Sequence, residues 1–291
     1  MLKETRYAPA KVNLALDILR KRPDGYHDMK MVMQTVSLCD VVTVEEQAEG
    51  FALCMEGFVP PEGKKTLEQR AAEAFFEELG QPVPGLTITI DKRTPAYAGM
   101  GGGSADVAAL LRILRDAYCP EMTGEVLERI GFRVGSDMPF CIRGGTALAE
   151  GRGEVLTDLP ALPDCWLVIC KPDFDIPTPV LFGKVRPEAF VNRPDIDGMI
   201  AALKAEDLKG IAERLCNVFE EVLPEDCTEV FAIKQKLLEL GALGAAMSGS
   251  GPTVFGIFAE ELAAQQAAEQ LRKNYRQTYL AKPVKKFAAG E

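Results

Sequence analysis

The stretch Pro95-Ala-Tyr-Ala-Gly-Met-Gly-Gly-Gly-Ser-Ala-Asp-Val-Ala-Ala-Leu-Leu111 places a run of glycines directly before a helix pattern. A strand is expected just before it, at residues 86–90, and the apolar spacing from Ser104 predicts a helix to about Tyr118. Because glycine has no Cβ, successive backbone N–H groups can turn toward one anion. The helix would add its free first N–H groups and the positive end of its dipole. The stretch therefore predicts a phosphate site at Gly99, Gly101, Gly102, Gly103 and Ser104.

This glycine run matches neither of the two common nucleotide-binding patterns. The patterns G-x-x-x-x-G-K-[ST] and G-x-G-x-x-G are both missing from the sequence, so the run belongs to another nucleotide-binding class. The alternative is a flexible surface turn. Three consecutive glycines before a helix are costly, however, unless the backbone must approach a ligand. We therefore expect the run to bind the phosphates of ATP.

The composition describes an acidic chain with a large core. Its 291 residues are 47% hydrophobic and carry a net charge of −10, which allows one large domain or two of ordinary size. The negative charge disfavours general binding to nucleic acid or to an anionic membrane. No apolar stretch approaches the roughly 20 residues that span a bilayer, and no apolar signal core follows Met1. We expect a cytoplasmic protein.

Cysteine and histidine usage excludes several kinds of site. The eight cysteines are scattered, with no C-x-x-C pair, so buried reduced thiols are expected rather than a redox or metal site. His27 is the one histidine in the sequence. A histidine-rich metal site is therefore excluded, as is a catalytic triad that uses any other histidine.

Strand and helix patterns are mixed in both halves of the chain, which predicts a mixed α+β class. The proline-rich stretch 159–163 is the best boundary between an N-terminal domain, residues 1–160, and a C-terminal domain, residues 161–291. A proline-rich loop is expected at 172–179. The spacing predicts strands at 7–19, 31–44, 86–90, 146–150, 154–156, 166–170, 242–247, 253–258 and 277–284, and helices at 68–79, 104–118, 124–130, 197–205, 207–219, 228–240 and 260–274.

Two further segments carry polar groups or glycines where a plain strand would not need them. In APAKVNL, residues 8–14, Lys11 and Asn13 are two positions apart, so they face the same side of a strand. A second glycine loop, with Ser248, Gly249, Ser250 and Gly251, lies between two predicted strands. Taken singly, a solvated lysine and a hairpin turn are the ordinary interpretations.

Taken together and in order, the segments APAKVNLALDI, PAYAGMGGGSADVAALL and MSGSGPTVFGIF resemble the three motifs of the GHMP kinases. The resemblance spans residues 7 to 258. It implies a small-molecule kinase with an N-terminal domain related to a ribosomal S5-like fold and a C-terminal ferredoxin-like domain. The active site would lie in the cleft between them, with ATP and Mg²⁺ as cofactors. The resemblance also implies nucleotide contacts from Lys92, Pro95, Ala105 and Asp106.

The resemblance implies that Asp137 is the catalytic base. Asp137 stands in an apolar segment, where desolvation would raise its pKa while Lys11 would oppose that shift. Asp137 would take the proton of the acceptor hydroxyl, and Lys11 would orient it and stabilise the developing charge. A helix-capping aspartate is the alternative. Asn13 could hold acceptor hydroxyls, and the second glycine loop would close the site by packing near the first.

The segment Arg22-Pro-Asp-Gly-Tyr-His27 resembles the members of this family that act on a small molecule containing cytidine diphosphate. A cytosine needs a stacking partner and hydrogen bonds to its edge, and Tyr26 and His27 can divide these tasks. By resemblance, Phe182 would supply the second stacking face and Thr178 a contact to cytidine or ribose. An ordinary apolar contact is an equally good interpretation of Phe182.

Three positions depart from the usual family pattern: Met100 stands for leucine, Ala105 for a second serine, and Thr66 for asparagine. No acidic cluster forms a metal cage, so Mg²⁺ is expected to arrive with ATP, with Ser104 as a possible ligand. A homoserine- or mevalonate-type kinase, a nucleotide-binding regulator without catalysis and a structural protein remain alternatives. The expected assembly is a monomer or a homodimer.

Overall fold

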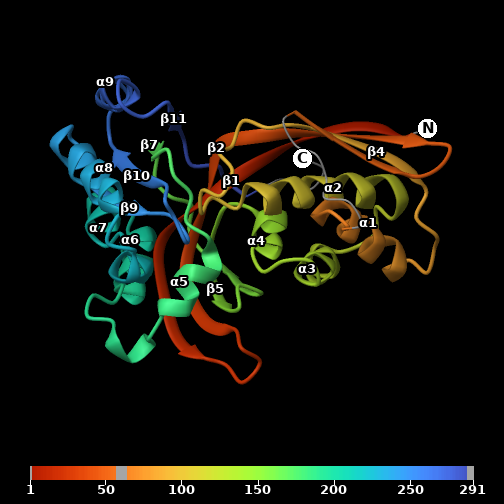
Figure 1. The fold of residues 1–291 in the computed structure, drawn as a ribbon, viewed down its shortest axis with the longest axis horizontal. Coiled ribbons are helices and arrows are strands. Elements are labelled where there is room, and N and C mark those ends of the chain that lie inside the picture. Colours follow the sequence, from red (N-terminus) through yellow and green to blue (C-terminus); the bar gives the residue numbers. More distant parts are fainter. Residues whose placement is uncertain (1, 57–63, 287–291) are drawn as a thin grey trace.

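The computed structural model describes residues 2–56 and 64–286, which form two β-sheets with helices packed on them (Figure 1). The strands are β1 Lys3–Lys21, β2 His27–Gln47, β3 Phe51–Met55, β4 Gly85–Asp91, β5 Thr146–Gly151, β6 Val155–Asp158, β7 Trp166–Lys171, β8 Cys216–Asn217, β9 Gly244–Met247, β10 Val254–Phe258 and β11 Gln277–Ala281. The helices are α1 Leu67–Glu78, α2 Gly102–Tyr118, α3 Gly124–Phe132, α4 Met138–Arg143, α5 Thr178–Lys184, α6 Ile196–Lys204, α7 Leu208–Glu213, α8 Thr228–Glu239 and α9 Glu261–Arg272.

The first sheet is built on β1 and β2, two long antiparallel strands (Figure 1). The strand order is β3-β4-β2-β1-β8, and β5 and β6 extend it from β2. The register of β1 against β2 shifts between Pro9 and Lys11 and again between Asn13 and Ala15. Such irregularities bend a strand and free ladder groups. The backbone N–H of Lys11 accordingly donates to Met100 O at 2.9 Å, which attaches the first glycine run to β1.

Helix α2 packs against β1 and β2, α4 packs against β1, and α1 and α3 pack against α2. From Ala105 to Leu114 the side chains of α2 are buried, because the helix lies between the sheet and its neighbours α1, α3 and α4. The N-terminal end of α2 is consequently fixed with respect to Lys11 on β1. This places the glycine run at the middle of the molecule rather than at an outer edge (Figure 1).

The second sheet has the antiparallel order β11-β7-β10-β9. With helices between β7 and β9 and between β10 and β11, the chain follows the βαββαβ order of a ferredoxin-like unit. Strand β8, from the C-terminal half, pairs in parallel with β1 of the first sheet. The two halves are thus joined at the strand that carries Lys11 and Asn13.

Most predicted elements are present, but several differ. The helix expected at 207–219 ends at Glu213, because Asn217 bonds to the carbonyls of Met247 and Gly249 and lies in β8. The loop expected at 172–179 turns into α5 at Thr178, since proline is well tolerated in a first helical turn. Helix α2 begins at Gly102 rather than at Ser104. The short elements β3, α4 and β8 were not predicted.

No helix within residues 2–56 or 64–286 combines the length and apolarity needed to cross a bilayer.

Candidate active site

A cavity of about 1610 Å³ runs past the N-terminal end of α2. Its lining comes from distant parts of the sequence, namely β1, the glycine run, the two residues before α4, α5 and the second glycine loop. The predicted site residues that line it are Lys11, Asn13, Tyr26, His27, Lys92, Pro95, Gly99, Gly101, Gly102, Gly103, Ser104, Asp106, Asp137, Thr178, Phe182, Gly249 and Ser250. The fold therefore assembles nearly all of them around one space.

Three predicted residues do not line the cavity. Ala105 is buried in the core, and its N–H donates to Gly101 O at 2.8 Å. Ser248 is fully buried and donates from Oγ to Gly99 O at 3.0 Å. Gly251 also lies outside the lining and faces the side chain of Met247. These residues hold the two loops in place, and they present no side chain to the cavity.

The first glycine run presents free donors to the cavity. Gly101 has a left-handed backbone with φ of 66° and caps α2. The first intrahelical bond is from Ala105 N to Gly101 O, so the N–H groups of Gly102, Gly103 and Ser104 have no acceptor within the helix. Three donors and a helix dipole thus meet at one end of the cavity, which suits an anion.

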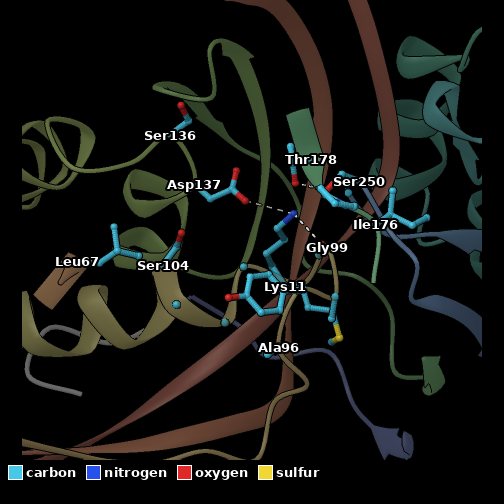
Figure 2. A pocket seen from close by; sticks show the side chains of 18 of the residues that line it. Lys11, Leu67, Ala96, Gly99, Ser104, Ser136, Asp137, Ile176, Thr178 and Ser250 are labelled. Carbon is cyan, nitrogen blue, oxygen red and sulfur yellow. Dashed lines mark hydrogen bonds and ion pairs between the residues drawn. The ribbon is translucent and has the colours of Figure 1, made fainter. Parts of the chain in front are cut away.

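Lys11 and Asp137 meet beside this helix end. Lys11 Nζ lies 3.4 Å from Asp137 Oδ2 and donates to Gly99 O at 3.1 Å (Figure 2). It also donates to Asn13 Oδ1 at 2.8 Å. The Lys11 side chain is 4% exposed, whereas that of Asp137 is 34% exposed. A Cβ added to Gly101 would stand 3.7 Å from Asp137 Oδ2. The ion pair and the free N–H donors therefore face the same small volume.

Asp137 does not act as a capping side chain within the described part of the chain. Asp137 occupies the N-cap position of α4, but its carboxylate makes no capping hydrogen bond. Figure 2 shows that carboxylate directed toward Lys11. Because one third of the side chain is exposed to the cavity, Asp137 is less desolvated than its apolar sequence neighbours suggest. It is accessible to a ligand.

Lys92 lies in a cluster of three ionisable groups, two of them buried, that the sequence did not predict. Its Nζ contacts the carboxylates of Asp40 and Asp106, the latter at 2.8 Å. Burial raises the pKa of Asp106 to about 8, although Lys92 acts in the opposite direction. Burial opposes the charge on Lys92, but Asp106 and Asp40 more than offset it and raise the pKa of Lys92. Asp40 was missed because only the fold brings β2 beside Lys92.

Aromatic side chains line another part of the cavity. The ring of His27 stacks on Phe182, with centroids 5.2 Å apart and an angle of 29°. Phe182 also packs edge-on against Phe219, 5.0 Å away. Burial, followed by the charge of Lys21, lowers the pKa of His27. A neutral imidazole carries one donor and one acceptor, and Tyr26 beside it is 52% exposed.

The second glycine loop interlocks with the first, as predicted. A Cβ at Gly99 would lie 2.1 Å from Ser248 O, and one at Gly249 would lie 2.5 Å from Gly99 O. Ser250 Oγ is 2.8 Å from Thr178 Oγ1 at the start of α5 (Figure 2). The first loop, the second loop and α5 therefore form one connected wall.

Two of the departures from the family pattern have structural roles. Thr66 Oγ1 accepts a hydrogen bond from Gln69 N at 3.2 Å and caps α1. Met100 is 1% exposed and belongs to the apolar core. Within the described part of the chain, no group of three or more histidine, cysteine or acidic side chains is arranged to hold a metal ion.

Comparison with known proteins gives concordant results. The profile of the GHMP kinases N terminal domain matches residues 66–145, and that of the GHMP kinases C terminal matches residues 199–277. A 4-diphosphocytidyl-2-C-methyl-D-erythritol kinase from Clostridium botulinum is 37% identical over 95% of this chain and 99% of its own length.

Solved structures agree with this relationship. The crystal structure of a 4-(cytidine 5'-diphospho)-2C-methyl-D-erythritol kinase matches with a TM-score of 0.80 and 34% identity, over 96% of this chain and 99% of that one. A homoserine kinase from Cytophaga hutchinsonii matches with a TM-score of 0.75 at 18% identity, over 98% and 95% of the two chains. The second match shows a shared two-domain fold alone. The chain belongs to the GHMP kinase family.

Proposed function

We propose that this protein transfers the γ-phosphoryl group of ATP to the 2-hydroxyl of 4-diphosphocytidyl-2-C-methyl-D-erythritol. The products are the 2-phosphate of that alcohol and ADP, and the reaction belongs to the non-mevalonate route to isoprenoid precursors. The full-length relative from Clostridium botulinum carries this activity in its name. The observation that supports the chemistry most directly is the Lys11–Asp137 pair beside three free N–H groups.

In this proposal Asp137 accepts the proton of the acceptor hydroxyl while that oxygen forms a bond to the γ-phosphorus. The bond from the γ-phosphorus to the bridging oxygen breaks, and ADP leaves with the electron pair. Lys11 holds Asp137 in position and stabilises the charge on the transferring group. The N–H groups of Gly102, Gly103 and Ser104 bind phosphate oxygens through the end of α2.

Mg²⁺ fits this donor set only when it binds together with ATP. The described residues offer no acidic cage, so phosphate oxygens and water would supply most of its ligands. Ser104, in the first turn of α2, and Asp137, beside Gly101, both line the cavity and are the residues that could contact the ion. When bound, Mg²⁺ neutralises charge on the phosphates.

The aromatic end of the cavity favours a cytidine-bearing acceptor over homoserine or mevalonate. Tyr26, His27 and Phe182 offer stacking faces and a neutral imidazole, and those smaller substrates contain no base to stack. ADP release should be measured with each of the three acceptors in the presence of ATP and Mg²⁺. Turnover of the cytidine-bearing acceptor alone is the expected result.

Asp137→Asn tests the assignment of the base. General base catalysis contributes roughly 10²- to 10⁴-fold, so kcat should fall by about that factor. The fold should persist, because Lys11 keeps Asn13 and Gly99 as partners. Asp173→Asn removes the same charge from an exposed position outside the cavity and serves as the control. Undiminished turnover by Asp137→Asn, or no turnover by the wild type, would contradict the proposal.

A further inference from the structure

A cation that the sequence analysis did not identify lies at the cavity wall. Arg152 stands in the turn between β5 and β6, flanked by Gly151 and Gly153 with φ of +69° and +121°. The backbone N–H of Arg152 donates to Glu154 Oε2 at 2.6 Å. The turn is close-packed against the loop before Asp137, because a Cβ at Gly153 would lie 2.9 Å from Ser136 O. The residue that follows Arg152 therefore packs against the residue that precedes Asp137.

The guanidinium of Arg152 is stacked between aromatic rings. Its Cζ lies 3.6 Å from the centroid of Tyr26 and 4.9 Å from that of Phe132. Arginine stacks on rings by its planar face, which leaves its N–H groups to donate at the edge. The Nε atom is buried and has no hydrogen-bond partner among residues 2–56 and 64–286. The stack orients the donors and does not satisfy them.

Two of the other cations that line the cavity are paired with carboxylates. Lys11 pairs with Asp137, and Lys92 pairs with Asp40 and Asp106. Arg152 lines the same cavity and forms no close ion pair within the described residues, although its charge helps to lower the pKa of Asp24. In a chain with a net charge of −10, such a cation is an uncommon local source of attraction for an anion.

We propose that Arg152 binds the diphosphate of the acceptor. This inference rests on the proposed function, in which the diphosphate joins the cytidine to the alcohol. The cytidine would lie against Tyr26, His27 and Phe182, and the alcohol must reach Asp137. Arg152 contacts Tyr26 directly and sits in a turn packed on Ser136, so it lies between the two ends. Its planar fork matches phosphate oxygens.

Two simpler accounts compete with this one. Arg152 could serve only to hold the ring of Tyr26, in which case its charge toward a ligand would be irrelevant. Alternatively, Lys21 could bind the diphosphate, since it also lines the cavity and forms no ion pair among the described residues. Lys21 is exposed at the end of β1, and its charge helps to lower the pKa of His27. Each account predicts a different pattern of affinities.

The experiment is a calorimetric titration of cytidine, CMP and CDP into the full-length wild type, Arg152→Met, Arg152→Lys and Lys21→Met. Arg152→Met keeps an apolar stem over Tyr26 but removes the charge. A charge-assisted hydrogen bond to phosphate corresponds to roughly tenfold to hundredfold in affinity. The ratio of CDP affinity to cytidine affinity, here called the CDP advantage, should therefore fall at least about tenfold in Arg152→Met. It should be partly restored in Arg152→Lys and stay within about threefold in Lys21→Met.

The outcomes separate this inference from the proposed function. An equal loss of cytidine and CDP affinity in Arg152→Met would show that Arg152 only supports Tyr26. Unchanged affinity for both ligands would show that Arg152 does not contribute to binding. Either result would overturn the inference. Loss of the CDP advantage in Lys21→Met with its retention in Arg152→Met would overturn it too. A wild type that binds none of the three ligands would overturn the proposed function itself.

Discussion

Gly99→Ala should uncouple the two glycine loops. The backbone of Gly99 has φ of +70°, and an added Cβ would stand 2.1 Å from Ser248 O and 2.8 Å from Gly251 N. Ordinary contact begins at 3.4 Å, so the loops would have to separate by about 1.3 Å. Neither neighbour is the flexible end of a side chain, so backbone must move.

The cost can be worked out from the contacts of Gly99. A left-handed backbone costs a non-glycine residue about 1–2 kcal/mol. Separation also weakens two hydrogen bonds to Gly99 O, from Ser248 Oγ at 3.0 Å and from Lys11 Nζ at 3.1 Å. These bonds contribute about 0.5–1.5 and 1.5–3 kcal/mol. With partial relaxation, the free energy of unfolding should fall by about 3 kcal/mol.

Activity should fall as well, because Lys11 loses one of the acceptors that hold it beside Asp137. A misplacement of about 1 Å can cost roughly 100-fold in rate, so kcat should fall by about that factor. Denaturant unfolding and steady-state ADP release measure the two effects. A Gly99→Ala protein as stable and as active as the wild type would refute the reasoning.

Gly103→Ala is the matched control, since it adds the same methyl group four residues later. At Gly103 the nearest atom to an added Cβ is Leu67 Cδ1 at 3.7 Å. Alanine inside a helix is about 0.5–1 kcal/mol more favourable than glycine, so stability should be unchanged or higher. The methyl group would enter the cavity, and the KM for ATP should rise. A larger stability loss here than in Gly99→Ala would contradict the geometric argument.

Two further predictions concern the ionisable cluster of Lys92 and the aromatic end of the cavity. Burial raises the pKa of Asp106 from 3.8 to about 8, so the folded state retains a proton that the unfolded state loses, and stability should fall as pH rises through this window. Denaturant titrations should compare the wild type with Asp106→Asn between pH 6 and 8. Over this range the wild type should lose up to about 2 kcal/mol of unfolding free energy more than the variant does. Parallel pH profiles for the two proteins would contradict this. Phe182→Leu removes the ring stacked on His27, which should weaken CDP binding about threefold to tenfold. Calorimetry should find ATP affinity unchanged, and equal losses for both ligands would point to a general disturbance instead.

Local signals in the sequence predict the bounds of several helices well. Helices α1, α3, α8 and α9 end within about two residues of the predicted bounds, because apolar spacing and turn residues act over a few positions. Periodicity indicated a mixed α+β chain, but it did not predict the specific architecture of an S5-like and a ferredoxin-like domain. That architecture came from the resemblance of three ordered motifs to a family, and the comparisons confirm it.

The features that were missed depend on contacts between distant residues. Strand β8 exists because Asn217 bonds to the second glycine loop and pairs with β1, and nothing near Asn217 in sequence signals this. The pairing of Asp40 with Lys92 and the stacking of Arg152 on Tyr26 are likewise set by the tertiary fold. The strands on either side of Arg152, at 146–150 and 154–156, were predicted, but the ring that its side chain contacts could not be.

The hydrogen bond from Asn13 N to Ser248 Oγ joins residues 235 positions apart. Contacts of such separation form slowly, because a long loop must close before they add stability. Synthesis proceeds from the N-terminus, so Lys11 and Asn13 leave the ribosome well before Ser248 does. A nascent chain would carry Asp137 and the first glycine run before the second glycine loop is present to pack against them. Catalytic competence therefore arrives as one of the last events in the making of the molecule.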